Sequence, residues 1–383
     1  MPYPRPLYLF ICWASLILAA GPDLLASSAL EISSGPNAAV LKDGKPFRAI
    51  GVNYFDCFLR TLEDGNDTSY ENGFAVLGAR GIPFVRFCAA GFWPKDMSLY
   101  QTDRAEYFRR LDRVVDSAGR RGIGMFPSLF WFYPTVPDLV GEPANAWGNP
   151  HSKTRAFMRN YVREVVTRYR QNPTVWGWEF GNEYSLGASL PNAGEHRPPV
   201  VPQLGTPASR SAQDELTFSM VREAFEDFAR EVRKYDPTRR PLITGDSILR
   251  DSAWHQEHEG NWKSDTPDQF AQMLKQMNPD PINCISLHLY EPPQWRHLSD
   301  AMQTGQKLNK PLFVGEFGVP GEGADAQAEF RRQIKQIIDS DVPLAALWVF
   351  DYSKQKDFSV TQSNSRSWQL DLIVEANRKL NGR

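Results

Sequence analysis

The chain has 383 residues, enough for two average domains or for one large α/β barrel. Its 43 basic and 45 acidic residues give a formal net charge of −2, so no overall field would attract nucleic acid or an anionic membrane. The composition therefore favours an uncharged or small partner and argues against the class of proteins that bind polyanions through their net charge.

The amino terminus has the pattern of a secretory signal peptide. Arg5 precedes the apolar run Leu7–Ala20, and small residues follow around Ala26–Ala29. A helix that spans a bilayer needs about 18 to 20 apolar residues, so export with cleavage is favoured over an uncleaved membrane anchor. We predict a signal peptide over residues 1–29, a mature chain over residues 30–383, and a secreted or periplasmic location.

The next predicted element is a short β-hairpin. Asp43 and Gly44 lie between two short apolar runs, and an Asp-Gly pair favours the tight turn of a hairpin. If the remainder of the chain forms a barrel, this hairpin is expected to plug the barrel floor.

From Phe47 onward, short apolar runs alternate with longer segments of helical period, which is typical of parallel βα units. The segments Arg104–Gly122 and Glu215–Pro237 carry apolar residues every three or four positions and are expected to be outer helices, as are Ala326–Ser340 and Arg366–Leu380. The predicted strands are Ala49–Tyr54, Ile82–Cys88, Ile123–Phe130, Val175–Gly181, Pro241–Asp246, Ile282–His288, Leu312–Glu316 and Leu344–Phe350.

Eight strands and eight helices over roughly 330 residues favour one (β/α)8 barrel, or TIM barrel, over an open doubly wound sheet. No Gly-rich dinucleotide or phosphate-binding motif is present, so nucleotide binding has no support. The long connections Tyr133–Pro150 and Tyr184–Arg210 should surround the active face, at the carboxyl ends of the strands. A disordered insertion is the alternative for the Pro-rich part of the second connection.

The cysteines do not form a recognisable pattern. Cys57, Cys88 and Cys284 remain after the predicted signal peptide, and they are odd in number without a repeated spacing. This excludes a disulfide framework and gives no metal cluster. Buried free thiols are the default expectation, with one disulfide bridge as the alternative.

Two carboxylates lie in the run "WGWEFGNEYS", Trp176 to Ser185, which otherwise has the character of a buried strand. Burying an ionised carboxylate costs several kcal/mol unless the charge is paired. Glu179 lies inside the predicted strand and is expected to be structural, either paired with an arginine of the barrel or hydrogen-bonded to its neighbours. Glu183 lies just past the carboxyl end of that strand, at the predicted active face.

A second carboxylate at a strand end is Glu316, in "LFVGEFGVP". Alone it could be structural, but together with Glu183 it places two glutamates across the barrel mouth. Such a pair suits glycosidic cleavage, because one carboxyl protonates the leaving oxygen while the other meets the developing oxocarbenium ion. A separation of roughly 5 to 5.5 Å leads to retention of configuration, and a wider one leads to inversion.

The combined pattern resembles the cellulases and mannanases of glycoside hydrolase family 5, within the clan of retaining barrel glycosidases. The resemblance spans most of the mature chain. Each motif is weak alone, but their order and their positions at strand ends make the set specific. The residues that carry it are Arg86 in "FVRF", Asn182 and Glu183 in "GNE", His288 and Tyr290 in "SLHLYEP", Glu316 in "VGEFG" and Trp348 in "LWVF".

The resemblance implies that Glu183 is the general acid/base and Glu316 the nucleophile. Arg86 and the Tyr290 hydroxyl would stabilise the ionised form of Glu316 and lower its pKa. Burial beside His288 would favour the protonated form of Glu183.

Substrate contacts are implied for two further residues. Asn182 would bind the sugar hydroxyl next to the reacting carbon, and Trp348 would stack on the sugar ring. Core packing is the alternative for Trp348, and a hydrogen-bonded structural pair is the alternative for His288 and Tyr290. Two or three of the loop tryptophans are also expected to line sugar subsites, from the set Trp93, Trp131, Trp147, Trp254, Trp262 and Trp295.

The chain also departs from the family pattern. Family members commonly carry a His near the end of the third strand, where this chain has "PSLFWFYP". This departure weakens any assignment of specificity, although "HLYEPPQW" and the position of Trp131 resemble mannanases and so hint at mannan.

Metal and cofactor sites are not predicted. His255 and His258 are three apart and would face one direction on a helix, but no further His or Cys lies nearby in the sequence. A metal-dependent hydrolase should have His or Asp at several strand ends, and the sequence lacks that pattern.

The sequence thus predicts a monomeric, exported, retaining β-glycoside hydrolase that acts on β-glucan or β-mannan without a cofactor. Its expected partner is carbohydrate, with no nucleic acid and no membrane after cleavage of the signal peptide. The alternative is a barrel that binds carbohydrate but is catalytically inactive.

Overall fold

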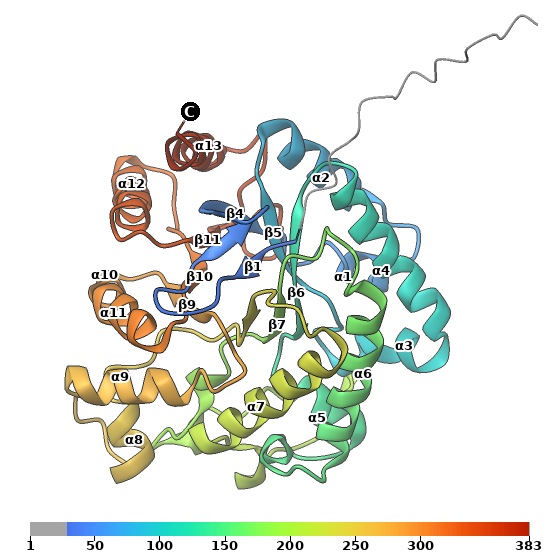
Figure 1. Cartoon of the computed structure of the whole chain (residues 1–383). Helices are drawn as coiled ribbons and strands as arrows, with labels where there is room; N and C mark the ends of the chain where they lie inside the picture. The colour runs from blue at the N-terminus through green and yellow to red at the C-terminus, as the bar shows by residue number, and fades with distance from the viewer. Residues whose placement is uncertain (1–28, 383) are drawn as a thin grey trace, which may run out of the picture.

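Eight parallel strands form the centre of the computed structural model, which describes residues 29–382 (Figure 1). Neighbouring strands pair in the order β8-β7-β6-β5-β4-β11-β10-β9. All eight predicted strands are present, although most are shorter than predicted. Their bounds are β4 Ala49–Asn53, β5 Phe84–Cys88, β6 Gly124–Phe130, β7 Trp178–Gly181, β8 Leu242–Ile243, β9 Ile285–Leu289, β10 Leu312–Phe317 and β11 Leu344–Leu347.

The ring closes between β8 and β9 through the side chain of Asn283. The backbone amide of Leu242 donates to the side-chain oxygen Oδ1 of Asn283 at 2.8 Å. The backbone amide of Asn283 in turn donates to the Leu242 carbonyl at 3.3 Å. The short β8 is therefore joined to β9 by a side chain that takes the place of a backbone acceptor. This arrangement confirms the predicted (β/α)8 barrel.

One long helix follows each strand and packs on the outside of the barrel (Figure 1). The predicted helix from Glu215 begins instead at Phe218, because the Thr217 hydroxyl caps the helix by accepting from the Met220 amide. The long helices are α2 Ser69–Arg80, α4 Arg104–Gly119, α6 Lys153–Tyr169, α7 Phe218–Tyr235, α9 Pro267–Gln276, α11 Leu298–Leu308, α12 Ala324–Asp339 and α13 Trp368–Leu380.

Shorter helices lie mostly in the connections at the carboxyl ends of the strands. Five are α-helical: α1 Leu59–Glu63, α3 Ser98–Thr102, α5 Thr135–Val140, α8 Ala253–Glu259 and α10 Pro292–Arg296. Six are 3₁₀ helices: η1 Pro94–Met97, η2 Ala144–Gly148, η3 Tyr184–Gly187, η4 Ala193–Glu195, η5 Pro202–Leu204 and η6 Ala212–Asp214.

The predicted hairpin closes the barrel floor, as expected. β2 (Val40–Lys42) and β3 (Lys45–Pro46) pair antiparallel, and β1 (Glu31–Ile32) adds a third strand. Asp43 and Gly44 both have positive φ, 53° and 72°, as a tight hairpin turn requires. The sheet packs its apolar side chains against the lower interior layer of the barrel: Leu30, Ile32 and Val40 lie in one buried cluster with Phe84, Phe126, Trp176 and Phe313.

The long connections pack on the barrel wall at the active face rather than forming disordered insertions. Arg210, at the end of the second connection, forms an ion pair at 2.6 Å with Asp138 in the first, and both side chains are buried. Gly205 lies against Pro94 in η1. These contacts tie three connections together around the mouth of the barrel.

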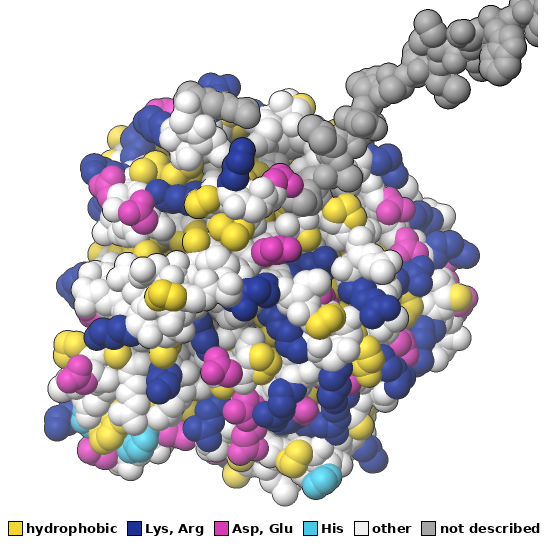
Figure 2. All heavy atoms as spheres, in the orientation of Figure 1, with side chains coloured by type: hydrophobic (Ala, Val, Ile, Leu, Met, Phe, Trp, Pro, Cys, Tyr) yellow, Lys and Arg dark blue, Asp and Glu magenta, His cyan; other side chains and the backbone are white. Residues whose placement is uncertain are grey.

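The remaining expectations of the sequence are met in part. Cys57, Cys88 and Cys284 are buried and free. The predicted signal peptide lies, except for its last residue, outside the described residues. Among the helices of residues 29–382, none has both the length and the apolar character needed to cross a bilayer. On the face shown in Figure 2, basic and acidic side chains are interspersed, in keeping with the net charge near zero.

Candidate active site

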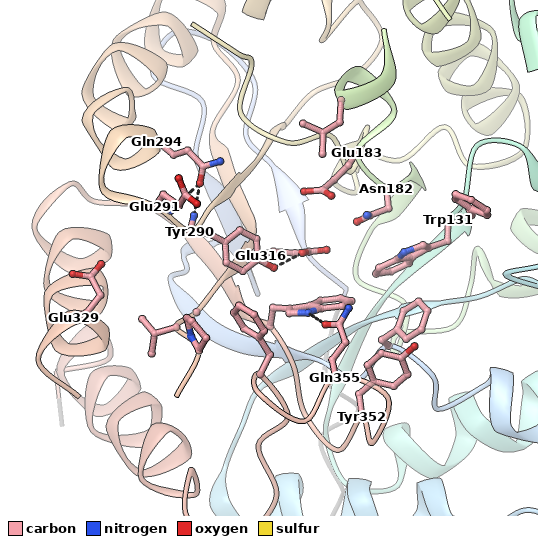
Figure 3. Close-up of a pocket in the computed structure, with 18 of the residues that line it drawn as sticks. Trp131, Asn182, Glu183, Tyr290, Glu291, Gln294, Glu316, Glu329, Tyr352 and Gln355 are labelled. Carbon is pink, nitrogen blue, oxygen red and sulfur yellow. Dashed lines mark hydrogen bonds between the residues drawn. The ribbon is translucent and has the colours of Figure 1, made fainter. Parts of the chain in front are cut away.

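A cleft of about 1190 Å³ opens where the strands of the barrel end (Figure 3). Five of the seven predicted site residues line it: Asn182, Glu183, Tyr290, Glu316 and Trp348. The other two, Arg86 and His288, lie beneath the cleft and are buried. All seven come together because parallel strands present their carboxyl ends on one face of the barrel.

Arg86, the central residue of β5, organises the floor of the cleft. Its Nε donates to both oxygens of Glu179, at 2.7 and 2.9 Å, so of the two expectations for Glu179 the arginine partner is confirmed. Its Nη1 donates to Glu316 Oε1 at 2.7 Å and to Asn53 Oδ1 at 3.0 Å. Its Nη2 donates to Asn182 Oδ1 at 2.8 Å. One fully buried cation thus fixes two carboxylates and two amides.

Glu316, on β10, is held at both carboxylate oxygens. Oε1 accepts from Arg86, and Oε2 accepts from the Tyr290 hydroxyl at 2.5 Å. Burial raises the pKa of this carboxyl, whereas His288, Arg86 and Tyr290 act to lower it. The predicted net lowering is therefore wrong, because the loss of hydration at a side chain that is only 5% exposed outweighs its favourable partners.

Glu183 follows β7 and adopts left-handed backbone geometry, with φ 54° and ψ 37°. Its Oε1 is hydrogen-bonded to His288 Nδ1 at 2.9 Å. Burial raises the pKa of Glu183 to about 6, against a smaller lowering effect of Arg86. Burial also lowers the pKa of His288 to about 4, so this imidazole is neutral near pH 7. The expected protonated character of Glu183 is thus supported by its surroundings.

The two glutamates lie close together across the cleft. Ligand atoms of Glu183, His288 and Glu316 all lie within 4.8 Å of one another. This spacing could hold a cation, but the Arg86 guanidinium bound to Glu316 opposes a second positive charge there. The same spacing suits chemistry that needs two carboxyl groups in different protonation states.

The histidine pair of the sequence has a structural explanation. His255 Nδ1 is hydrogen-bonded to Asp265 Oδ1 at 2.7 Å, and His258 Nδ1 to the backbone oxygen of Trp254 at 2.8 Å. The two imidazoles therefore have separate partners and do not converge on a common site.

Aromatic side chains form one wall of the cleft. Trp131 and Trp348 stack with ring centres 5.9 Å apart, and Arg86 lies 4.3 Å from the centre of the Trp131 ring. Trp348 Nε1 donates to Gln355 Oε1 at 2.6 Å, so its ring is fixed while one face borders the cleft. Of the six loop tryptophans, only Trp131 lines the cleft, where two or three were expected. Trp147 and Trp295 instead fill the core.

A family model, Cellulase (glycosyl hydrolase family 5), matches residues 40–361, which is most of the chain. The chain belongs to glycosyl hydrolase family 5. The sequence resemblance, which rested on seven short-motif residues, is therefore confirmed at the level of the family.

Curated relatives match over shorter segments. A mannan endo-1,4-beta-mannosidase F of Aspergillus clavatus is 31% identical over 87 residues, which cover 21% of this chain and 19% of the relative. A probable mannan endo-1,4-beta-mannosidase C of Aspergillus terreus is 27% identical over 139 residues, or 33% of this chain and 31% of the relative. The chain thus matches less than a third of the length of either relative.

Solved structures match over nearly the whole chain but with low identity. An endo-1,4-beta-mannanase from Rhizomucor miehei has a TM-score of 0.67 at 16% identity and covers 93% of this chain and 100% of its own. An exo-beta-1,4-mannosidase from an Opitutaceae bacterium has a TM-score of 0.60 at 18% identity, covering 88% and 60%. At these identities the similarity establishes a shared fold.

The family 5 site includes residues that sequence reasoning missed. Asn53 ends β4 and donates to the Gly315 carbonyl at 2.9 Å while accepting from Arg86. A polar residue at a strand end was a signal that could have identified it. Tyr352, Gln355 and Phe358, in the connection after β11, also line the cleft. No motif marked this segment, which reaches the cleft only through its tertiary packing.

Proposed function

We propose that the chain is a retaining β-glycoside hydrolase that cleaves β-1,4-linked mannan, with Glu316 as nucleophile and Glu183 as general acid/base. The observation that carries this proposal is that one carboxyl oxygen of Glu183 and one of Glu316 lie within 4.8 Å of each other. Direct attack by a carboxylate needs a separation of about 5 to 5.5 Å, whereas inversion needs about 6.5 to 9.5 Å to admit a water molecule.

The first chemical step forms a bond between a Glu316 oxygen and the anomeric carbon. As the glycosidic bond breaks, the proton of Glu183 passes to the leaving oxygen. In the second step Glu183 accepts a proton from water, the water oxygen bonds to the anomeric carbon, and Glu316 leaves as a carboxylate. Two inversions give net retention.

The hydrogen-bond pattern supports this division of roles. Arg86 and Tyr290 both donate to Glu316, which stabilises the ionised form needed for attack. Glu183 has the neutral His288 as its partner and is therefore the carboxyl of the pair that more readily keeps a proton. Because Arg86 occupies Asn182 Oδ1, the amide nitrogen of Asn182 is available to donate to the sugar hydroxyl next to the reacting carbon.

Mannan is the proposed substrate because the relatives reported above are named mannan endo-1,4-beta-mannosidases. Trp131 and Trp348 both line the cleft, and aromatic rings at such a position can pack on sugar rings. Export of the chain, as its amino terminus predicts, would bring the enzyme to a polysaccharide outside the cell. A barrel that only binds carbohydrate would not need two glutamates of which one is bound by Arg86 and the other by a neutral histidine.

Hydrolysis of β-1,4-mannan, mixed-linkage β-glucan and carboxymethyl cellulose, followed by reducing ends and by the anomeric configuration of the products, tests the proposal. We expect the highest kcat/KM on mannan, with products of retained configuration. Preferred cleavage of a glucan would overturn the substrate, and inverted products would overturn the mechanism. Binding without hydrolysis on all three would favour the inactive carbohydrate-binding barrel.

The dependence of kcat/KM on pH should be bell-shaped with an acidic optimum. Glu183 must be protonated, so activity on mannan falls as the pH rises through about 6. Glu316 must be ionised, and since burial raises its pKa, activity falls on the acid side at a higher pH than for an exposed glutamate. A pH series on a neutral oligosaccharide measures both limbs. Activity that stays maximal well above about pH 7 would contradict the assignment of Glu183.

A further inference from the structure

The turn that carries Glu183 is held by the segment after β8 as well as by its own two backbone hydrogen bonds, from the Leu186 and Ala188 amides. We call residues 183–188 the acid/base turn. Glu183 has positive φ without being glycine, a geometry that persists only where surrounding contacts hold it. Its carboxyl makes a single hydrogen bond, to His288, within the part of the chain that the structure describes. The backbone of this turn must therefore be positioned by other groups.

Those groups lie in the segment after β8. The Glu183 amide donates to the Gly245 carbonyl at 3.0 Å, and the Ser185 amide donates to Asp246 Oδ1 at 3.0 Å. A Cβ at Gly245 would lie 1.9 Å from the Gly181 carbonyl oxygen, so only glycine lets the two segments approach this closely. The amide side of the acid/base turn is thus anchored to residues 245 and 246.

Arg250 holds the carbonyl side of the same turn. Its Nη1 donates to the carbonyls of Ser185 and Leu186, at 2.8 and 2.9 Å, and its Nη2 donates to the carbonyl of Ala188. Its Nε donates to Gln256 Oε1 at 2.7 Å, which fixes the guanidinium from α8. A single side chain therefore donates to three carbonyl groups, those of residues 185, 186 and 188, at the end of this 3₁₀ turn.

Asp246 is only 3% exposed, and its Oδ1 also accepts from the Ser247 amide at 3.1 Å. Its Oδ2 has no hydrogen-bond partner within residues 29–382. A buried carboxylate with one unpartnered oxygen is costly for the fold. The amide that Asp246 binds outside its own segment is that of Ser185, in the acid/base turn.

We propose that Asp246 and Arg250 are positioning residues for the acid/base step, because together they hold residues 183–188 so that the Glu183 carboxyl faces the bond to be cleaved. This inference rests on the proposed role of Glu183. Neither residue touches the reacting atoms, and each acts through the backbone. Leu186, which Arg250 also anchors, lines the cleft, so the same contacts shape its wall.

A comparison of leaving groups tests the proposal. A mannan oligosaccharide needs its leaving oxygen protonated, whereas a 2,4-dinitrophenyl β-glycoside of the same sugar does not. We expect Arg250→Met to lower kcat/KM about 10- to 100-fold on the oligosaccharide but less than about threefold on the dinitrophenyl glycoside. An equal loss on both substrates, or no loss on either, would overturn the proposal.

Two sets of variants separate positioning from loss of the fold. Arg233 is the matched control, because it also donates to two backbone carbonyls, those of Thr238 and Arg240, outside the cleft. Arg233→Met should leave both kcat/KM values unchanged. Asp246→Asn keeps an acceptor for the Ser185 amide and should retain most activity, whereas Asp246→Ala should show the selective loss on the oligosaccharide.

Amide hydrogen exchange tests the same contacts without a substrate. In the wild-type protein the amides of Glu183 and Ser185 should be strongly protected, and Arg250→Met should reduce their protection while Arg233→Met does not. If the amides of Glu183 and Ser185 exchange fast in the wild type, or if Arg250→Met leaves their exchange unchanged, the proposal is wrong. If the wild type cleaves no β-glycoside but the exchange results hold, the proposed function fails while the anchoring of the turn stands.

Discussion

Replacing Glu316 with glutamine should reduce kcat/KM by about 10⁵- to 10⁶-fold on every β-glycoside, including aryl glycosides with good leaving groups. The amide oxygen can still accept from Arg86, and the amide nitrogen can donate to the Tyr290 hydroxyl oxygen, but the amide cannot attack the anomeric carbon. The loss should therefore be independent of the leaving group, because no other step can replace bond formation. Steady-state rates on mannan and on a 2,4-dinitrophenyl β-glycoside measure this directly.

The same substitution should keep or raise the melting temperature. In the wild type, one buried cation faces two buried carboxylates, Glu179 and Glu316, so the group carries an excess negative charge. Glutamine removes that excess, keeps the hydrogen bond from Arg86 and can donate to the Tyr290 hydroxyl oxygen. Burial no longer opposes an ionised group at this position. Thermal unfolding tests this expectation.

Glu231→Gln is the matched control. Glu231 is a buried, ion-paired glutamate in the last turn of α7, outside the cleft, and its loss should change kcat/KM less than about twofold. A Glu316→Gln protein that keeps substantial activity on aryl glycosides would show that another group forms the covalent bond. A Glu316→Gln protein that unfolds would show that the charge of Glu316 is needed for the fold.

Much of this site could be predicted because strand order alone brings its residues together. Arg86, Glu183, His288 and Glu316 lie at or near the carboxyl ends of different predicted strands, and a closed parallel barrel places all of those ends on one face. The pairing of Glu179 with an arginine was one of the two arrangements that the sequence allowed, because a charge inside a buried strand needs a partner. These inferences required the topology but no side-chain coordinates.

The sequence could not weigh opposing effects or place loop side chains. It identified the groups that lower the pKa of Glu316, but the opposing effect of burial depends on how closely the cleft walls pack around the carboxyl. Trp131 and Trp147 both lie in long connections, yet one borders the cleft and the other is fully buried, which depends on how each connection folds back on the barrel. The role of Arg250 could not be predicted for the same reason, since it depends on contacts with backbone carbonyls of another connection.

The second large effect is expected for Glu183→Ala, and it should depend on the leaving group. On mannan oligosaccharides kcat/KM should fall about 10²- to 10⁴-fold, because the departing oxygen must then leave without a proton. On a 2,4-dinitrophenyl β-glycoside kcat/KM should be nearly unchanged, but kcat should fall, because the covalent intermediate has lost the base that activates water. Kinetics on the two substrates separate the acid role from the base role.

Azide distinguishes this assignment from its reverse. Azide needs no base, so in Glu183→Ala it should displace Glu316 from the covalent intermediate, restore kcat on the dinitrophenyl substrate and give a β-glycosyl azide. In Glu316→Ala, azide would instead occupy the place of the missing nucleophile and give an α-glycosyl azide. An α-product from Glu183→Ala would mean that the roles of the two glutamates are exchanged. That result would require the carboxyl bound by Arg86 and Tyr290 to be the proton donor, against the charge distribution around it.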